Sequence, residues 1–165
     1  MRYASLIFSL LLFVAYSCNS ESSSTAGQPD LAKALIGTWE SVSVNVLVQS
    51  ADSIEGESYE FVIGENEWET KIGSLPILSY YETENNTYRM LFRNASTLPD
   101  GDMVRGKWFV NDNVLRLVTE KDTNEYEVTL DGGLMTFKQT VDWDGDGATD
   151  DEYTAVHRKI SNYTR

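Results

Sequence analysis

Apolar and polar residues alternate at period two along most of this chain, which is the pattern of β-strands with one buried face. The alternation is first clear over residues 38–49, where Trp and Val recur among Ser, Asn and Gln. Further segments of the same character predict strands at Glu57–Ile63, Glu67–Ile72, Ile77–Thr83, Thr87–Arg93, Met103–Val110, Val114–Thr119, Glu125–Leu130, Leu134–Val141 and Tyr153–Ile160. The sequence therefore predicts about ten short strands.

The joins between these segments are rich in turn residues, as in Gly64-Glu-Asn, Asn85-Asn86 and Asp131-Gly-Gly. No helical pattern of any length separates the strands, so we expect an antiparallel meander without parallel crossovers. Two all-β architectures fit this pattern, a closed up-and-down barrel and a two-sheet sandwich. Closure leaves no exposed sheet edge, so we favour an all-β antiparallel barrel of about 8–10 strands.

A short helix is predicted ahead of the first strand. Pro29 stands at its start, the segment Asp30–Ile36 forms its body, and Gly37 follows its end. Proline near the start and glycine just past the end are typical of helix boundaries. Leu31 and Leu35 fall on one face of this helix, which suits a helix that covers the structure beneath it.

The N-terminal residues are typical of an exported protein. Arg2 precedes an apolar run from Leu6 to Ala15, which is too short to span a bilayer as a helix and has the arrangement of a secretory signal peptide. Ser17 directly before Cys18, the single cysteine of the chain, resembles the lipobox of bacterial lipoproteins. That resemblance implies that Cys18 is acylated and becomes the first residue of the mature protein.

These features predict a lipoprotein signal peptide over residues 1–17, a flexible polar linker over 18–28 and one barrel domain over 29–165. The expected location is the cell envelope, with an acyl anchor in the outer membrane. The alternative is that Cys18 is a late signal-peptide residue and that cleavage occurs further on, for instance after Ala26. With no second cysteine, no internal disulfide can form, so the core must stabilise the fold unaided.

The negative charge of the chain limits the kinds of partner that it can bind. The formal net charge is −13 at pH 7, with 26 acidic against 13 basic side chains. Nucleic acid is therefore excluded as an expected partner, because phosphate binding requires basic groups. Anionic bilayers should also repel the domain, so acyl chains rather than surface charge would hold it at the membrane. We expect a monomer.

Several segments carry a resemblance to a known family: Leu35–Trp39 at the junction of the helix and the first strand, the hairpins Gly106–Leu115 and Tyr126–Phe137, and His157–Lys159 at the end of the last strand. They resemble lipocalins and, more broadly, the lipocalin-like domain lipoproteins of Bacteroidetes. The resemblance implies a barrel that binds a small apolar or amphiphilic ligand. It also implies that Trp39 packs at the closed end of the barrel, with Arg158 across its ring as a cation–π partner.

One loop carries a metal-binding pattern. Over residues 142–152, acidic residues occupy relative positions 1, 3, 5 and 9 around a Gly at position 6, which is the spacing of calcium loops. The expected ligands are the carboxylates of Asp142, Asp144, Asp146 and Asp150 and the backbone carbonyl of Ala148. The twelfth position is Tyr153 rather than the usual Glu, and the flanks are predicted strands. We therefore expect a weak structural calcium site of about 10⁻⁴–10⁻³ M at a hairpin tip, or else a solvated acidic turn.

Catalytic patterns have no support in the sequence. His157 is the single histidine, so a three-histidine zinc site is impossible, and no nucleophile elbow or phosphate-binding glycine loop is present. We therefore expect a protein without enzymatic activity. A set of strand aromatics would either line a pocket or fill the core, the second being favoured: Trp68, Tyr80, Tyr81, Tyr88, Phe92 and Trp108.

Three functions remain open from the sequence. The first is a lipid-anchored barrel that binds a small apolar or amphiphilic ligand without reacting with it. The second is a β-rich interaction or scaffold module of the outer membrane, whose barrel is filled by side chains. The third is a calcium-stabilised surface adhesin or carbohydrate-binding domain built as a sandwich.

Overall fold

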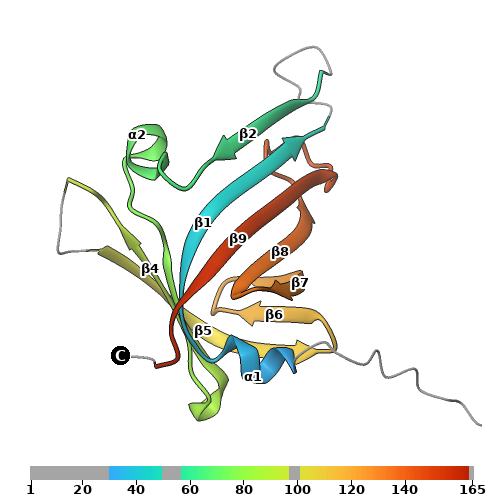
Figure 1. Cartoon of the computed structure of the whole chain (residues 1–165). Coiled ribbons are helices and arrows are strands. Elements are labelled where there is room, and N and C mark those ends of the chain that lie inside the picture. The colour runs from blue at the N-terminus through green and yellow to red at the C-terminus, as the bar shows by residue number, and fades with distance from the viewer. Residues whose placement is uncertain (1–29, 50–56, 97–100, 164–165) are drawn as a thin grey trace, which may run out of the picture.

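The computed structural model describes residues 30–49, 57–96 and 101–163, which form an antiparallel β-barrel with short helices (Figure 1). The strands are β1 Gly37–Val48, β2 Tyr59–Ile63, β3 Leu78–Tyr81, β4 Thr87–Arg93, β5 Gly101–Asn111, β6 Val114–Val118, β7 Thr123–Asp131, β8 Leu134–Val141 and β9 Asp151–Ser161. The helices are α1 Leu31–Leu35, α2 Trp68–Ile72 and the 3₁₀ turn η2 Glu84–Asn86. The predicted signal peptide, the linker and Cys18 lie outside the described residues.

Eight strands close into a barrel because the first and last of them pair with each other. Each of β3 to β9 pairs antiparallel with its neighbour in the chain, β1 pairs with β3 along its first residues, and β1 pairs with β9 over most of its length. The ninth strand, β2, pairs with the second half of β1. This closure confirms the predicted all-β barrel and excludes the two-sheet sandwich.

A β-bulge in β1 explains how one strand keeps its apolar residues inside along its whole length. Ser41 pairs with His157 but Ser43 pairs with Val156, so β1 has one residue more than β9 at this point. The extra residue, Val42, shifts the alternation by one position. Odd-numbered side chains such as that of Trp39 therefore face inward before the bulge, and even-numbered side chains such as that of Val46 face inward after it.

Helix α1 covers the closed end of the barrel beside Trp39. The indole Nε1 of Trp39 donates a hydrogen bond of 2.7 Å to the carbonyl of Leu35, and both side chains are buried. The ammonium group of Lys159 lies 5.3 Å from the centroid of the Trp39 ring and donates a hydrogen bond of 2.8 Å to the carbonyl of Ala34. The last strand and α1 are thus joined around one tryptophan.

The predicted pairing of Trp39 with Arg158 is wrong, because neighbouring residues of a strand face opposite sides of the sheet. Lys159 faces the interior end where Trp39 lies, whereas Arg158 faces outward. The guanidinium group of Arg158 forms exposed ion pairs with Glu40 at 3.2 Å and with Glu65 at 2.7 Å.

The predicted strand Glu67–Ile72 is also wrong, because this segment forms α2. A carboxylate oxygen of Glu67 accepts a hydrogen bond from the backbone N–H of Gly64 at 2.8 Å and forms an ion pair with Lys71 one turn later at 3.0 Å. Gly73 ends the helix at φ +65°, a conformation that glycine adopts without strain. The buried face of this single turn is the side chain of Trp68.

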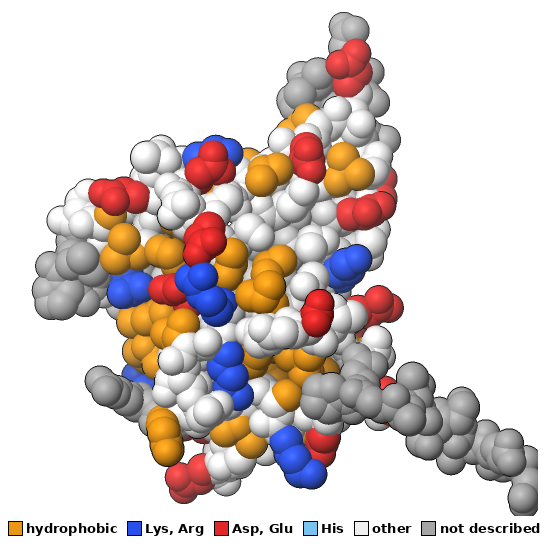
Figure 2. Space-filling model, in the orientation of Figure 1, with side chains coloured by type: hydrophobic (Ala, Val, Ile, Leu, Met, Phe, Trp, Pro, Cys, Tyr) orange, Lys and Arg blue, Asp and Glu red, His pale blue; other side chains and the backbone are white. Residues whose placement is uncertain are grey.

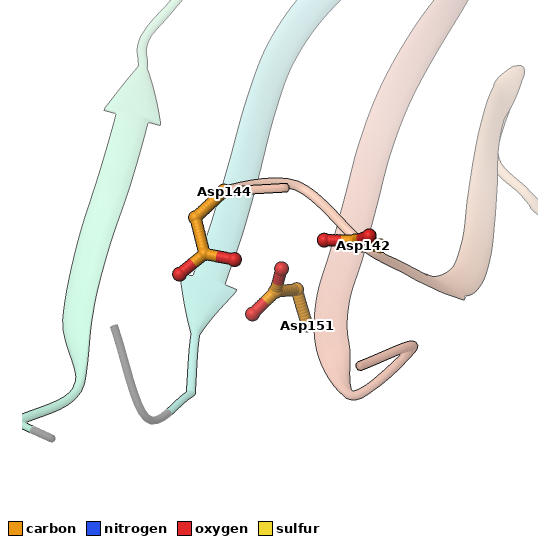
Figure 3. Close-up of side chains that lie close together, drawn as sticks. All are labelled: Asp142, Asp144 and Asp151. Atoms are coloured by element: carbon orange, nitrogen blue, oxygen red, sulfur yellow. The ribbon is translucent and has the colours of Figure 1, made fainter. Parts of the chain in front are cut away.

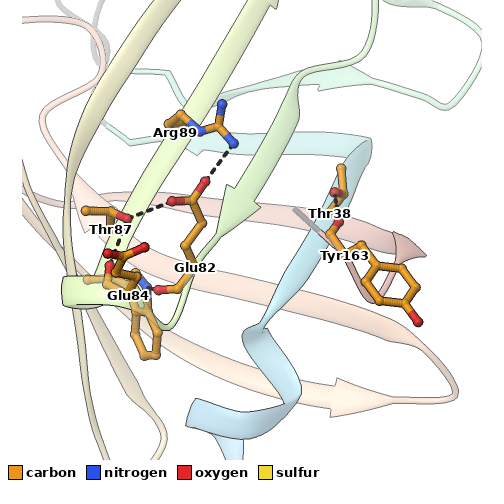
Figure 4. A network of polar contacts seen from close by, with 7 residues as sticks. Thr38, Glu82, Glu84, Thr87, Arg89 and Tyr163 are labelled. Carbon is orange, nitrogen blue, oxygen red and sulfur yellow. Dashed lines mark hydrogen bonds and ion pairs between the residues drawn. The ribbon is translucent and has the colours of Figure 1, made fainter. Parts of the chain in front are cut away.

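Polar contacts tie β3 to β4 near the closed end (Figure 4). The carboxylate of Glu82 accepts hydrogen bonds from Arg89 at 2.6 Å and from the hydroxyl of Thr87 at 3.0 Å. The backbone carbonyl of Glu82 accepts a third from the indole of Trp108 at 3.0 Å. In the same view, the hydroxyl of Thr38 donates to the backbone carbonyl of Tyr163 at 2.7 Å, which holds Tyr163 against β1.

Most of the candidate pocket aromatics fill the core. Trp68, Tyr81, Tyr88 and Trp108 are all buried, and the ring of Tyr81 lies between those of Tyr88 and Trp108 with centroid distances of 6.3 and 6.5 Å. On the face shown in Figure 2, hydrophobic side chains form several separate patches, and charged side chains lie between them. No helix in the described part of the chain is long and apolar enough to cross a membrane.

Candidate functional site

The barrel wall opens between β7 and β8. These two strands pair only from Glu127 with Lys138 to Asp131 with Leu134, next to the turn that joins them. Beyond Glu127, the residues of β7 pair only with β6, and beyond Lys138 the residues of β8 pair only with β9. The two strands therefore diverge toward the end of the barrel that carries the β6–β7 and β8–β9 loops.

A recess of about 530 Å³ occupies this divergence. Its size lies within the range of small-molecule sites in proteins, which is roughly 300–1,000 Å³. One wall comes from β6 and β7 and is formed by Val114, Glu125, Tyr126 and Glu127. The other wall comes from β8 and β9 and is formed by Lys138, Gln139, Thr140, Glu152, Tyr153 and Thr154. We call this feature the β7–β8 recess.

Two tyrosines line the inner side of the β7–β8 recess. The rings of Tyr126 and Tyr153 lie 6.3 Å apart between centroids, and Phe137 lies 5.3 Å from Tyr126. Burial raises the pKa of both phenols, although a hydrogen bond with Gln139 acts against the shift at Tyr126. Both phenols are therefore neutral at physiological pH and present aromatic faces together with hydroxyl groups that donate and accept hydrogen bonds.

A third phenol lies deeper in the barrel. Tyr81 has no exposed surface, and its hydroxyl has no hydrogen-bond partner within the described residues. Burial, and next the charge that Tyr126 would carry, raise the pKa of Tyr81. A buried hydroxyl without a partner is uncommon in folded proteins, since it costs about 1–3 kcal/mol.

Charged side chains form the outer rim of the β7–β8 recess. Glu125 is paired with Arg116, at 2.6 Å between a carboxylate oxygen and Nε. Glu127, Glu152 and Lys138 form no ion pair among the residues that the structure describes. The rim therefore carries two carboxylates without an ion pair and one ammonium group, that of Lys138, which is the cross-strand neighbour of Glu127.

The acidic loop joins β8 to β9, as predicted, and brings three carboxylates together (Figure 3). Oxygens of Asp142, Asp144 and Asp151 all lie within 4.8 Å of one another. Asp142 and Asp144 are exposed, whereas Asp151 is buried at the start of β9. Loss of hydration, and then repulsion from the neighbouring carboxylates, raise the pKa of Asp144.

Only part of the predicted calcium ligand set meets in this cluster. Asp142 and Asp144 belong to it, Asp146 and Asp150 do not, and Asp151 takes a place that the spacing did not assign. Asp146 instead accepts a hydrogen bond from the backbone N–H of Ala148 at 2.7 Å.

The three clustered carboxylates are already hydrogen-bonded to the backbone. Asp142 accepts from Gly145 and Gly147 at 2.8 and 3.1 Å, and Asp151 accepts from Gln49 and Trp143 at 2.8 and 2.6 Å. Each carboxylate oxygen retains a second lone pair that suits a hard cation. Calcium binding by this loop stays a prediction.

Trp143 connects the acidic loop to the β7–β8 recess. Its ring lies 5.8 Å from Phe61 on β2 and 6.4 Å from Tyr153, which lines the recess. Its backbone N–H is the donor to Asp151. The indole is 45% exposed, so its fluorescence should respond to changes both in the loop and at the mouth of the recess.

His157 lies in the core rather than in a site. It is buried, its Nδ1 lies 3.3 Å from the hydroxyl oxygen of Ser41, and its ring centroid lies 4.6 Å from that of Phe137. Burial lowers its pKa from 6.5 to about 4, so the imidazole is neutral at physiological pH.

Sequence reasoning missed the recess residues. The alternation of Glu125, Tyr126 and Glu127 does show a tyrosine facing inward between two outward carboxylates. Nothing in that alternation shows where β7 leaves β8, because the divergence depends on which residues pair between the strands. Comparison of the sequence with known protein families finds no match, and comparison with curated proteins finds none that is similar.

Proposed function

We propose that this protein is an exported, lipid-anchored, lipocalin-like barrel that binds a small amphiphilic molecule in the β7–β8 recess without reacting with it. The observation that carries the proposal is the combination of aromatic floor and polar rim. Tyr126 and Tyr153 offer apolar ring surface on the inner side, and charged or polar side chains surround the opening. An amphiphilic molecule would bury its apolar part on the rings and keep its polar part at the rim.

The rest of the barrel supports binding at this place. Packed aromatic side chains such as Trp39 and Trp108 are buried in the closed half of the barrel, whereas the recess lies where the strands diverge. The third function, a calcium-stabilised adhesin or carbohydrate-binding domain, was expected to have a two-sheet sandwich. The sheet is instead a closed barrel.

A neutral fluorescent probe tests the proposal. N-phenyl-1-naphthylamine should bind the full-length chain at one site, with a rise in its emission. Thr140 is exposed and lines the recess, so Thr140→Trp should fill the recess and weaken the probe at least about tenfold. The control is Thr136→Trp on the same strand, where β8 pairs with β7 and the wall is closed.

Three outcomes are informative. Loss of probe binding in Thr140→Trp alone would support the β7–β8 recess as the site. Equal binding by both variants would place the probe elsewhere and contradict the proposal. Absence of binding by the unmodified chain would favour the second function, an interaction module whose barrel is filled by side chains.

The membrane anchor is a separate part of the proposal and rests on the sequence alone. The support is the apolar run that precedes Ser17 and Cys18. Intact mass spectrometry of the protein isolated from its host should show acyl chains on an N-terminal Cys18, and Cys18→Ser should abolish the modification. An unmodified mature N-terminus beyond Cys18, for instance after Ala26, would contradict lipid anchoring but not export.

A further inference from the structure

We propose that the ligand of the β7–β8 recess is an organic cation, a small amphiphile whose polar end is an ammonium group. The inference rests on the proposed function, because it names the chemical class of ligand for the same recess. It follows from two independent observations, the charge of the rim and the nature of the floor.

The rim favours positive charge. The recess is lined by Glu125, Glu127 and Glu152 against Lys138. Arg116 compensates Glu125 through an ion pair of 2.6 Å, which leaves two carboxylates and one ammonium group to face a ligand. The whole chain carries a net charge of −13, so the long-range field also attracts cations and repels anions.

The aromatic floor of the recess, formed by Tyr126 and Tyr153, also favours positive charge, through cation–π interactions. The faces of aromatic rings attract cations, and proteins commonly bind quaternary ammonium groups between several aromatic rings. The rings of Tyr126 and Tyr153 lie 6.3 Å apart with their planes at 53°, and both residues line the recess. The two phenols are neutral, and a neutral phenol oxygen still accepts hydrogen bonds from an ammonium group that carries hydrogen.

Other head groups fit less well. A sulfate, phosphate or carboxylate would meet two unpaired carboxylates and the negative faces of two rings, with Lys138 as the one cation of the lining. A neutral hydroxyl group would form hydrogen bonds at the rim but would gain no attraction from the negative charge of the rim. An ammonium group is attracted by the carboxylates, the rings and the phenol oxygens together.

Three probes that share one apolar group separate these classes. Benzyltrimethylammonium, benzyl alcohol and phenylmethanesulfonate carry the same aromatic ring with a positive, neutral or negative substituent. Isothermal titration of the full-length chain should show that the cation binds at least about tenfold more tightly than the anion. The neutral alcohol should lie between them. The preference should fall as salt is added.

A charge-matched pair of variants locates the effect. Glu127→Gln combined with Glu152→Gln should weaken the cation about fivefold, the size expected for two partly exposed charges, and leave the alcohol unchanged. The control, Glu57→Gln combined with Glu69→Gln, removes the same charge from exposed positions outside the recess lining. It should change the affinity for the cation less than about twofold.

The outcomes distinguish the two proposals. Equal binding of the three probes, all lost in Thr140→Trp, would overturn the cation inference and leave the proposed function standing. An equal effect of the two double variants would also overturn it, because the preference would then come from the overall charge. If none of the three probes binds and N-phenyl-1-naphthylamine does not bind either, both proposals fail.

Discussion

Acid should destabilise this protein through one buried side chain, that of His157. The imidazole is 6% exposed and packs against Phe137, with Ser41 as its hydrogen-bond partner. Burial disfavours the charged form and lowers the pKa from 6.5 to about 4. Because the chain contains a single histidine, one residue accounts for any histidine titration.

The size of the effect follows from proton linkage. Between about pH 6.5 and pH 4 the unfolded chain binds a proton at His157 that the folded chain does not bind, so stability falls as the pH falls. At pH 5 the unfolded imidazole is almost fully protonated, whereas the folded imidazole is about one tenth protonated. The free energy of unfolding should therefore be lower at pH 5 than at pH 8 by about 2 kcal/mol from this residue alone.

Urea unfolding at pH 8 and pH 5, followed by tryptophan fluorescence, tests this prediction. The comparison is with His157→Gln, which is neutral at both pH values and retains a hydrogen-bonding group for Ser41. The many carboxylates titrate in both proteins, so their contribution cancels in the difference between them. The stability of the unmodified chain relative to the variant should fall by about 2 kcal/mol from pH 8 to pH 5. A difference that does not change with pH, or a histidine that titrates near 6.5 by NMR in the folded chain, would refute the reasoning.

Two further predictions concern the acidic loop and the closed end. If the loop binds calcium with a dissociation constant of about 1 mM, calcium at about 10 mM should stabilise the chain by about 1.4 kcal/mol and raise Tm by about 3 °C. Asp144→Asn should abolish that rise and Asp102→Asn, on β5, should keep it, whereas a Tm independent of calcium in the unmodified chain would end the calcium hypothesis. At the closed end, Lys159→Met should cost about 1–2 kcal/mol, because it removes the charge above Trp39 and the hydrogen bond to Ala34. Arg158→Met should cost less than about 1 kcal/mol in the same denaturation assay, because its ion pairs are exposed. The reverse order would contradict the assignment of Lys159 as the partner of Trp39.

The strands of this barrel were largely predictable because they depend on local alternation. Thr87–Arg93 and Leu134–Val141 were predicted with the boundaries that the structure has, and the others differ by a few residues at their ends. The turn residues between them, such as those of 131–133, lie where the structure has tight hairpins. Closure was predictable as well, since an antiparallel meander without disulfides is best protected when its edges pair.

The segment Glu67–Ile72 shows where alternation fails. Trp68, Thr70 and Ile72 are compatible with a strand by their period, yet the segment is a single helical turn. Over so few residues, a helix and a strand place similar side chains on one face, so periodicity cannot separate them. The helical turn is instead stabilised by the contacts of Glu67 with Gly64 and Lys71, and it ends at Gly73 in the left-handed conformation.

The candidate site was less predictable than the fold, because it depends on pairing between strands. Arg158 and Lys159 are neighbours in β9, so their side chains lie on opposite faces of the sheet. An error of one residue in the predicted register therefore exchanged the partner of Trp39, which is Lys159, for Arg158. Asp151 was visible in the acidic loop, but only the turn that returns the chain to β9 brings it beside Asp142. The β7–β8 recess arises where pairing stops, which no local pattern encodes.

The most direct test of the central claim is site-resolved NMR of the ¹⁵N-labelled chain during titration with benzyltrimethylammonium. The account predicts saturable amide shift changes at Glu125–Glu127 and Lys138–Thr140, the two edges of the β7–β8 recess. The turn at 131–133, at the closed end of the same two strands, should not change. Changes confined to that turn, or spread evenly over the surface without saturation, would contradict the claim that this recess is a binding site.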